Sequence, residues 1–588
     1  MNFLTKTDFK IARECPTKLY YRKSGYPSTA DENDFLAMLK NQGYAIGAMA
    51  RLYFPEGILI ATPNHQTALA LTEQYLQRNK VTLFEAAFQS NGKFVRADIL
   101  VKNDTHLTLI EVKAASLDVT QGNPFRNKNG TINADGRKYL EDIAFQALVL
   151  REIFPNHTIT CELMMVDKNC PVIIDNLPAW FDLQTSEDGV KVKFTGDAAQ
   201  ICAHPMLVRQ NIDSEVDQLI GEISSLLGDW VTSLNPLTKI VSLLAFKKCN
   251  GCEYHLPDLS EKDGFRECWG ARADTQPHIL ELCYGSQVRG IDTLIANGAT
   301  SLADIPHDNL RDAKGNFGKR ASQQLRQIEY ALAQKEYIDP ALGDKLANFP
   351  YPFHFIDFET ITPAMPFHSG MRPYQSIAFQ WSCHTLRAPG AALEHIEWIN
   401  TEPANPNINF VMSLMQQLQR QGTVFMWSHH ENNILAQIQV HESKLPPDVC
   451  DWLEWITNGR LVDMNKLAVD HYFHPRMKGS TSIKYVLDAL WQTQPALRDR
   501  FPKYIKEENG QLLSPYKTLP PLALESDDLT VQKGTEAILA YQAMLYQCED
   551  EMEKDRRKQQ LLDYCELDTL AMVMIFWHWQ EKLRQFNE

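Results

Sequence analysis

The 588-residue sequence lacks several features that would place a chain in a special class of proteins. No uninterrupted apolar run approaches the roughly 20 residues that span a bilayer, and the first residues lack the apolar stretch of a signal peptide. There is no internal repeat, no low-complexity tract and no Gly-x-x-x-x-Gly-Lys-Ser/Thr sequence for nucleotide phosphates. These absences predict a cytoplasmic protein without a membrane span and without a built-in ATP-driven helicase.

The composition is that of a globular protein with an excess of acidic residues. Hydrophobic residues make up 44% and charged residues 22% of the chain, and its length predicts about two to four domains. The formal net charge of −15 excludes a wholly basic nucleic-acid-binding surface but allows a local basic groove. Twelve cysteines without a secretion signal indicate a reducing compartment, in which most of them should be buried thiols.

Hydrophobic patterns predict an alternation of strands and helices along much of the chain. The expected strands are Thr82–Phe88, Phe94–Val101, Leu107–Lys113 and Phe353–Phe358. The expected helices are residues 5–15, opened by Thr5 with Asp8 as a capping-box partner, Arg137–Phe154, short helices within Ile291–Glu336, and roughly the last thirty residues.

A predicted β-hairpin carries the first candidate site. Two strand-like stretches, residues 94–101 and 106–113, are separated by a short polar turn. Because side chains alternate across a strand, Glu111 and Lys113 share one face. With Asp98 on the preceding strand, two carboxylates can hold a divalent metal ion. The lysine can then position a water molecule or neutralise charge on a scissile phosphate.

The order Asp98, Glu111-x-Lys113 resembles the PD-(D/E)XK nuclease motif. Glu85 upstream and Gln146 on the following helix match the extra acid and the helix glutamine of the RecB-like branch. The resemblance implies that the acids bind metal, while Gln146 and a nearby tyrosine or lysine orient the substrate. A lone Glu-x-Lys on an exposed hairpin is common, so the interpretation depends on all these positions occurring in order.

Cysteines flank this module on both sides. Cys15 precedes it, while Cys249, Cys252 and Cys268 follow it. A Cys-x-x-Cys turn can place two thiolates on one metal, and distant cysteines can complete the coordination. This arrangement resembles RecB-like nucleases with an iron–sulfur staple, which implies a structural [4Fe-4S] cluster. Cys283 is an alternative to Cys268, and the sequence leaves a Zn²⁺ ion on the same residues, or buried free thiols, as alternatives.

A second set of acids lies in the C-terminal half. Asp357 and Glu359 share one face of the predicted strand Phe353–Phe358. An acid–x–acid pair can hold two metal ions, one to activate water and one to stabilise the leaving oxygen. Tyr564 and Asp568 are four residues apart on the predicted C-terminal helix, so they project from one helical face.

These features resemble the DEDD exonucleases with an RNase H-like fold, in the subgroup with a Tyr-x-x-x-Asp last motif. The resemblance implies that Tyr564 orients the attacking water and that Asp568 binds metal. The middle motif is best matched by Trp427–Asn433, in which Glu431 replaces the usual aspartate. Asp463 is the alternative for that role.

The whole chain resembles a family of bacterial proteins that join these two modules. The stretches that support the match are Arg372–Gln375, Phe379–Ser382 and Gly479–Lys484. We therefore expect a mixed α/β chain in three parts. These are a RecB-like PD-(D/E)XK domain with the cysteine cluster (1–275), a helical linker module (276–348) and an RNase H-like DEDD exonuclease-like domain (349–588).

The function expected from these motifs is a metal-dependent nuclease that hydrolyses phosphodiester bonds in DNA with Mg²⁺ or Mn²⁺. Single-stranded DNA or duplex ends would be the partner, in repair, recombination or defence against foreign DNA; the sequence names no protein partner and no membrane. One alternative is an RNA-processing 3′–5′ exonuclease, because nothing in the sequence reads a 2′-hydroxyl. The other is a nucleic-acid-binding scaffold in which one or both sites have decayed.

Overall fold

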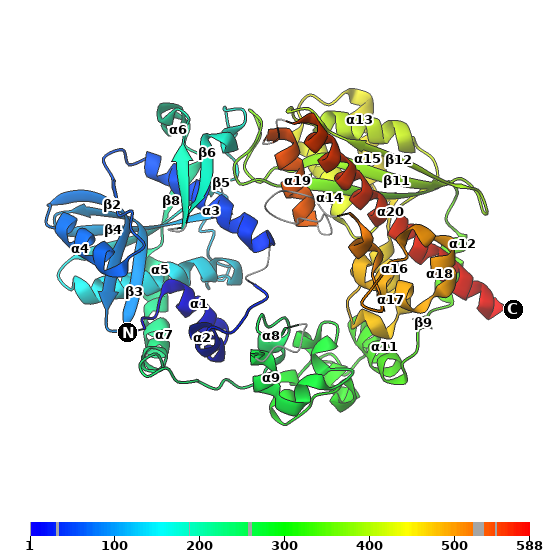
Figure 1. Ribbon diagram of the computed structural model, residues 1–588, viewed down its shortest axis with the longest axis horizontal. Coiled ribbons are helices and arrows are strands. Elements are labelled where there is room, and N and C mark those ends of the chain that lie inside the picture. Colours follow the sequence, from blue (N-terminus) through cyan, green and yellow to red (C-terminus); the bar gives the residue numbers. More distant parts are fainter. Residues whose placement is uncertain are drawn as a thin grey trace. The chain divides into compact units, whose positions relative to one another are not determined.

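The computed structural model describes most of the chain as a mixed α/β protein, as predicted. The described residues are 2–30, 34–120, 122–186, 189–256, 262–520, 534–546, 548 and 550–587. The chain forms two compact units (Figure 1). The first comprises residues 1–243, 251–268 and 362–375, and the second comprises residues 244–250, 269–361 and 376–588. Among the described helices, none is long and apolar enough to cross a bilayer.

A six-stranded sheet in the order β1-β2-β3-β4-β5-β8 forms the centre of the first unit. Its strands are β1 (Ile58–Leu59), β2 (Lys80–Ser90), β3 (Lys93–Asn103), β4 (His106–Leu117), β5 (Thr158–Asp167) and β8 (Leu207–Asn211). β3 and β4 are antiparallel and are joined by a two-residue turn, in which Asp104 has a φ of +54°. The predicted hairpin is therefore confirmed, with strands slightly longer than expected.

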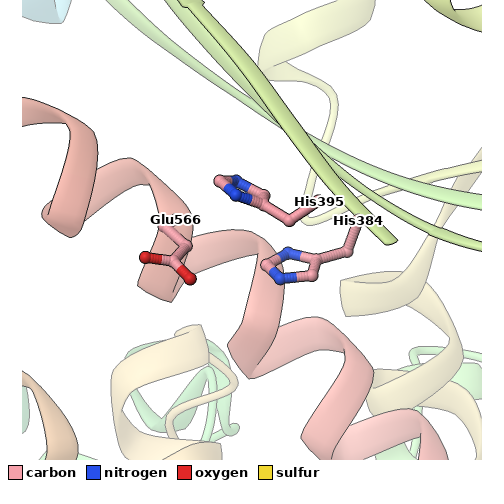
Figure 2. A group of neighbouring side chains, drawn as sticks. All are labelled: His384, His395 and Glu566. Atoms are coloured by element: carbon pink, nitrogen blue, oxygen red, sulfur yellow. The ribbon is translucent and has the colours of Figure 1, made fainter. Parts of the chain in front are cut away.

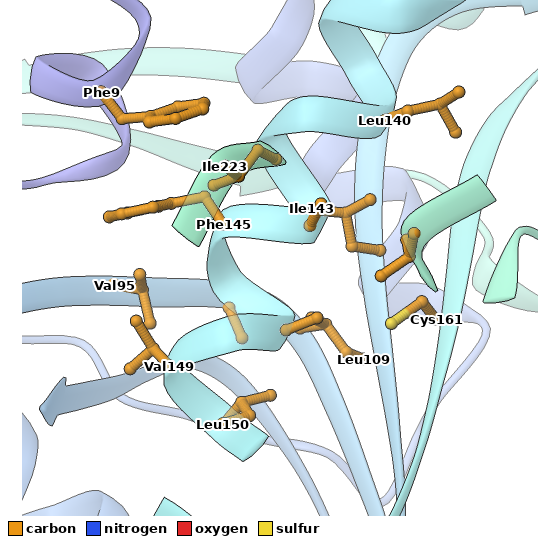
Figure 3. Close-up of a cluster of buried hydrophobic side chains, with 14 of the residues drawn as sticks. Phe9, Val95, Leu109, Leu140, Ile143, Phe145, Val149, Leu150, Cys161 and Ile223 are labelled. Atoms are coloured by element: carbon orange, nitrogen blue, oxygen red, sulfur yellow. The ribbon is translucent and has the colours of Figure 1, made fainter. Parts of the chain in front are cut away.

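Three helices cover one face of this sheet. They are α1 (Lys6–Glu14), α5 (Ala134–Ile153) and α7 (Asp213–Thr232). The predicted start of α1 is confirmed, because Thr5 and Asp8 form a capping box. Phe9 of α1, Leu109 of β4 and Phe145 of α5 are almost fully buried in the common core (Figure 3). α5 connects β4 to the parallel strand β5, so it lies across the strands that carry the first candidate site.

The other face of the first sheet is covered by α3 (Asp34–Leu52), by the hairpin of β6 (Phe181–Ser186) and β7 (Gly189–Phe194), and by a distant piece of chain.

That distant piece, residues 362–375, follows a strand of the second unit in sequence. Ala364 and Met365 are buried in the same core as residues of β3 and β4. The Val172 amide donates to the Met371 carbonyl at 2.9 Å, and the Tyr374 hydroxyl donates to the Ala114 carbonyl at the end of the Glu-x-Lys strand. The loop of residues 362–375, which follows β10 in sequence, thus completes the core of the first unit.

The second unit contains a five-stranded sheet in the order β12-β11-β10-β13-β14. Its strands are β10 (Phe353–Ile361), β11 (Ile377–Leu386), β12 (Leu393–Ile399), β13 (Thr423–Met426) and β14 (Leu461–Asp463). β10, β11 and β12 are antiparallel neighbours, whereas β10, β13 and β14 run parallel. The predicted strand at 353–358 is confirmed as β10, the central strand of this sheet.

Helices lie on both faces of this sheet (Figure 1). α13 (Asn407–Leu418), α14 (His430–His441) and α15 (Pro447–Thr457) pack on one face, where the even-numbered Ile356 and Phe358 of β10 are buried. The C-terminal helix α20 (Glu551–Asn587) and α19 (Gly534–Tyr546) lie on the other. The odd-numbered Phe353 and Phe355 contact Phe576 of α20 there. This alternation directs Asp357 and Glu359 toward α20.

Short helices precede this sheet in the second unit. They include α8 (Phe246–Cys249), α10 (Ile291–Ala296), α11 (Lys319–Ala333) and α12 (Ala341–Ala347). α10 ends at Ala296 and is followed by an Asn297-Gly298 turn, in which Gly298 has a φ of +103°. The segment expected as a helical linker, residues 276–348, lies within the second compact unit.

Candidate metal centres

The first candidate centre lies on the β3–β4 hairpin. The Asp98 carboxylate accepts a hydrogen bond from the Val112 amide at 2.8 Å, which holds it beside β4. Lys113 Nζ donates to Glu111 Oε1 at 2.7 Å, as expected for two side chains on one strand face. The hairpin therefore brings together the three residues predicted from the Asp, Glu-x-Lys pattern.

Glu111 is the most enclosed acid of this centre, with 1% of its surface exposed. It accepts hydrogen bonds from Lys6 and Lys113, both at 2.7 Å, and from Gln146 at 2.6 Å. Burial alone would raise its pKa, but the charges of Lys113 and Lys6 outweigh burial and hold the pKa of Glu111 below its usual range. Glu111 is therefore an ionised, well-paired carboxylate at neutral pH.

Helix α5 contributes Gln146 and Asp142, which are one turn apart. Gln146 is fully buried, and its Oε1 has no hydrogen-bond partner in the described part of the chain. Asp142 Oδ2 lies 2.5 Å from Lys113 Nζ and 2.7 Å from Lys10 Nζ. The structure thus places the predicted Gln146 at the centre and adds Asp142, an acid that the motif comparison did not select.

Glu85 lies in β2 opposite Asp98, where the regular pairing with β3 is interrupted. Its backbone φ of +56° is unfavourable for a residue with a side chain. Burial and the charge of Glu111 raise the pKa of Asp98, and the Glu85 charge adds to this rise. Glu85 is half-exposed, with its Oε2 3.7 Å from Arg96 Nε. The predicted extra acid is therefore close enough to act electrostatically on Asp98.

Sequence reasoning missed Lys6 and Lys10. The two lysines are four residues apart on α1, so they project toward the centre from one face of the helix. Lys6 Nζ lies 4.0 Å from Asp98 Oδ1 and also contacts Glu111. The helix itself was predicted, but its sequence contains no signal that shows which strands it covers.

Two of the predicted cluster cysteines, Cys15 and Cys268, lie close enough to interact electrostatically. Cys15 immediately precedes α2 (Pro16–Lys23), and the Tyr21 hydroxyl on α2 lies 3.1 Å from Cys268 Sγ. Burial is the main cause that raises the pKa of Cys268, and a negative charge on Cys15 adds to it. The N-terminal helices and the segment that contains Cys268 therefore form one local arrangement.

Cys252 lies on the same segment of the first unit, which is anchored by an ion pair of 2.5 Å between Lys18 Nζ and Glu253 Oε2. Cys249 and Cys283 belong to the second unit. The described part of the chain contains two groups of possible metal-binding side chains in which the ligand atoms lie within 4.8 Å of one another, and neither group contains these cysteines. The shared cysteine cluster stays a prediction.

The second candidate centre lies where β10 meets α20. Asp357 and Glu359 of β10 and Cys565 of α20 each offer an atom within 4.8 Å of the other two. The Cys565 sulfur is 3.8 Å from Asp357 Oδ2. Asp568 lies almost one turn further along α20. Burial raises the pKa of both β10 acids, and the charge of Asp568 adds to the rise. The structure therefore brings the first and last predicted acidic motifs together.

Glu431 joins them from the start of α14. It is 2% exposed, and its Oε2 has no hydrogen-bond partner among the described residues. Burial raises the pKa of Glu431 to about 8, and the charges of Asp463 and Asp568 add to the rise. A buried acid with an unbonded oxygen in an acidic neighbourhood is suited to a cation.

Asp463, the alternative middle acid, is engaged differently. Its Oδ1 accepts backbone hydrogen bonds from Ser428 at 3.0 Å and from Lys466 at 3.1 Å. The second bond caps the start of α16 (Met464–His471). Its Oδ2 lies 3.6 Å from His429 Nε2. Asp463 thus caps a helix next to the centre, whereas Glu431 has a buried oxygen without a hydrogen-bond partner among the described residues.

Burial perturbs all four carboxylates of this centre, and repulsion by neighbouring acids adds to its effect on Asp357, Glu359 and Glu431. The pKa of each is raised, with burial as the largest cause. Lys484 opposes the rise for Glu359 and for Asp568. Four acids that repel one another in a buried site favour the binding of divalent cations.

Two aromatic hydroxyls and a lysine surround Asp568. The Tyr516 hydroxyl donates to Asp568 Oδ1 at 2.5 Å, and a hydrogen bond from Tyr564 also lowers the pKa of Asp568. Lys484 Nζ donates to the Tyr564 hydroxyl at 3.1 Å. Sequence reasoning placed Tyr564 correctly beside Asp568 but missed Tyr516, which lies in the short segment Pro515–Thr518 without a recognisable pattern.

Comparison with known proteins gives one family match. A family model described as a domain of unknown function, DUF2779, matches residues 354–482. The matched stretch contains Asp357, Glu359, Glu431 and Asp463, but it ends before α20 and excludes the first unit. No curated protein and no solved structure matches the chain.

Proposed function

We propose that the chain is a metal-dependent nuclease that hydrolyses phosphodiester bonds in DNA, with one reaction centre in each unit. The observation that carries the proposal is the convergence of four acids from three elements of the second unit, β10, α14 and α20; three of the acids are buried and Asp357 is half-buried. They are Asp357, Glu359, Glu431 and Asp568. Burial raises the pKa values of all four, and repulsion adds to the rise for three of them. A bound cation would therefore offset the unfavourable free energy of ionised carboxylates in the metal-free site.

In the second centre, these acids would hold Mg²⁺ or Mn²⁺, in an RNase H-like domain of the DEDD type. Bound divalent ions supply activation of water and stabilisation of the leaving oxygen. The Tyr564 hydroxyl, which Lys484 orients at 3.1 Å, would position the attacking water. Tyr516 would hold the Asp568 carboxylate in place through its short hydrogen bond.

In the first centre, Asp98, Glu111 and Glu85 would provide the metal-binding acids of a RecB-like PD-(D/E)XK domain. The Lys6 ammonium already lies between Asp98 and Glu111, at 4.0 and 2.7 Å from their oxygens. A positive charge is therefore accommodated at that position. Lys113 would neutralise charge on the scissile phosphate, with Gln146 holding Glu111.

We also propose a structural [4Fe-4S] cluster on Cys15, Cys249, Cys252 and Cys268, with Zn²⁺ as the competing occupant. The electrostatic interaction of Cys15 with Cys268, which also contacts Tyr21, supports it. Iron, sulfide and zinc analysis of anaerobically purified protein would decide between the two. Cys268→Ser should lose the bound metal, whereas Cys283→Ser is the matched control that should keep it.

The cleavage test compares wild type, Lys113→Ala, Asp357→Ala and the double variant on end-labelled single-stranded DNA, duplex DNA and RNA with Mn²⁺. Each single change should remove a distinct set of products, and the double variant should remove both. Cleavage confined to RNA would favour the RNA-processing alternative. Wild-type protein that binds metal and nucleic acid but cuts none of the three substrates would overturn the proposal and favour a scaffold.

A further inference from the structure

A second cluster of metal-binding side chains lies in the second unit, apart from the four acids. It consists of His384 on β11, His395 on β12 and Glu566 on α20. One ligand atom from each residue lies within 4.8 Å of the other two. Figure 2 shows both imidazole rings on the side of the strands that faces the helix carrying Glu566.

The sheet register brings the two histidines together. His384 and His395 are direct partners in the antiparallel β11–β12 pair, so their side chains project from the same face. Their rings are stacked with centroids 4.5 Å apart. The two histidines therefore meet because of strand pairing, although the sequence separates them by a turn.

Hydroxyl groups hold both rings. His384 Nδ1 lies 2.7 Å from Thr569 Oγ1, and His395 Nε2 lies 2.9 Å from Ser382 Oγ. The two hydroxyls are themselves 2.9 Å apart. Each ring has a second nitrogen, so a hydroxyl contact on one nitrogen is compatible with coordination by the other. Fixed outer-shell partners of this kind orient histidine ligands in metal sites.

Both histidines are in surroundings that favour the neutral imidazole, which is the form that binds metal ions. Burial lowers the pKa of His384 to about 3, and it also lowers the pKa of His395. A proton therefore does not compete for the imidazole lone pair at neutral pH. Glu397, on the same face of β12, lies 3.8 Å from His395 Nε2 and offers a further carboxylate nearby.

We propose that His384, His395 and Glu566 bind one divalent transition-metal ion of the Zn²⁺ class. Two imidazoles and a carboxylate are ligands that such ions prefer, whereas Mg²⁺ favours oxygen ligands alone. The four acids of the neighbouring centre are all oxygen ligands, so the two sites would select different ions. A fourth position would be filled by water or by Glu397.

The role of this ion would be to fasten the β11–β12 edge of the sheet to α20. Glu566 precedes Asp568 by two residues, and Thr569 follows it. An ion held by both strands and the helix would fix the helical turn that presents Asp568 to the β10 acids. It would thus position a ligand of the acidic centre without taking part in cleavage.

Without an ion, the same contacts would be a packed histidine pair, with Lys503 compensating Glu566. Lys503 Nζ lies 3.8 Å from Glu566 Oε2, but its side chain is 68% exposed and free to swing into solvent. Zinc and cobalt titrations separate the two interpretations, because a packed pair has no measurable metal affinity.

The test uses the full chain, stripped of metal and titrated with Zn²⁺ by calorimetry in the presence of excess Mg²⁺. Co²⁺ is used in parallel, because its visible bands report ligand type. We expect Glu566→Gln and His395→Gln each to weaken one Zn²⁺ site by at least about 100-fold, more than loss of an outer-shell partner costs. Glu566 is partly exposed, so its change should leave the fold intact.

Two controls separate this site from the others. His307→Gln alters an exposed histidine of the same unit and should leave Zn²⁺ binding unchanged. Asp357→Asn with Glu359→Gln should weaken Mn²⁺ binding but keep the nitrogen-ligated Co²⁺ spectrum, so failure of the nuclease proposal would not affect this result. Equal Zn²⁺ stoichiometry and affinity in wild type, His395→Gln and Glu566→Gln would overturn the inference.

Discussion

The two acidic centres are built from the same residue types but balance their charge in opposite ways. In the first, Glu111 and Asp142 each contact two lysine ammonium groups. In the second, Asp357 and Glu359 face other acids, and their pKa values are raised. Similar metal-binding motifs can therefore occur in a centre whose carboxylates are paired with lysines and in one whose carboxylates repel one another when no metal is bound.

The largest expected effect is at the second centre. Asp357→Asn should lower Mn²⁺-dependent cleavage by about 100- to 1,000-fold, equivalent to several kcal/mol of lost transition-state stabilisation. The same change should raise the urea midpoint of the metal-free protein, because it removes one of the carboxylates that repel one another. Lys113→Ala at the first centre should lower both activity and stability. If metal-free Asp357→Asn unfolded at a lower urea concentration than metal-free wild type, the acids of the second centre would not repel one another as proposed.

The next effect is on stability at the first centre. Glu111→Gln leaves Lys6 and Lys113 without their shared carboxylate, so the free energy of unfolding should fall by about 3 kcal/mol, near the lower end for breaking a buried ion pair. Urea denaturation measures this. Asp217→Asn, which breaks an exposed pair with Arg151, is the control and should cost less than about 1 kcal/mol. Equal effects would mean that Glu111 is not specially paired.

The pH dependence of stability should differ in sign between Glu431 of the second centre and Glu111 of the first. The raised pKa of Glu431, surrounded by Asp357, Glu359, Asp463 and Asp568, means that the folded state binds more protons than the unfolded state between pH 4.5 and about 8. Metal-free stability should therefore fall as pH rises through this window, by up to about 1.4 kcal/mol per pH unit for each titrating group.

Urea midpoints measured across this window, with wild type and Glu431→Gln, check the slope. The variant should be flatter, and saturating Mn²⁺ should flatten the wild type in the same way. The lowered pKa of Glu111 acts in the opposite sense, because its stabilisation is present above pH 4.5 and is lost as pH falls below it. A wild-type slope that Glu431→Gln leaves unchanged would contradict the assignment.

The smallest effect concerns the hydrogen bond from Tyr516 to Asp568. Tyr516→Phe removes a donor that lowers the pKa of Asp568, so Mn²⁺ affinity should fall by about 10-fold, as for other outer-shell partners. Tyr564→Phe is the matched comparison and should reduce the rate of cleavage at saturating Mn²⁺. If both changes altered metal affinity alone, Tyr564 would have no role in positioning water.

Local sequence patterns were sufficient for the hairpin and for the acid pair of β10. Strand alternation alone predicts that Glu111 and Lys113 touch, and that Asp357 and Glu359 share a face, since each pair is two residues apart. The capping box of α1 is equally local. The mixed α/β class follows from the same patterns.

Features that depend on how distant elements pack together could not be predicted from local sequence patterns. Lys6 reaches Glu111 only because α1 packs against the hairpin. The choice between Glu431 and Asp463 depends on which acid the start of α16 uses as its cap. Likewise, His384 and His395 meet only in one register of β11 and β12, which no single residue of either strand specifies.

The loop of residues 362–375 affects how the protein folds while it is synthesised on the ribosome. The core that contains Ile110 is closed by Ala364 and Met365 of this loop. By the time these residues are synthesised, β10 with Asp357 and Glu359 has already been made. The first unit therefore cannot finish folding before the second has begun to emerge, and no single cut in the chain would release either unit whole.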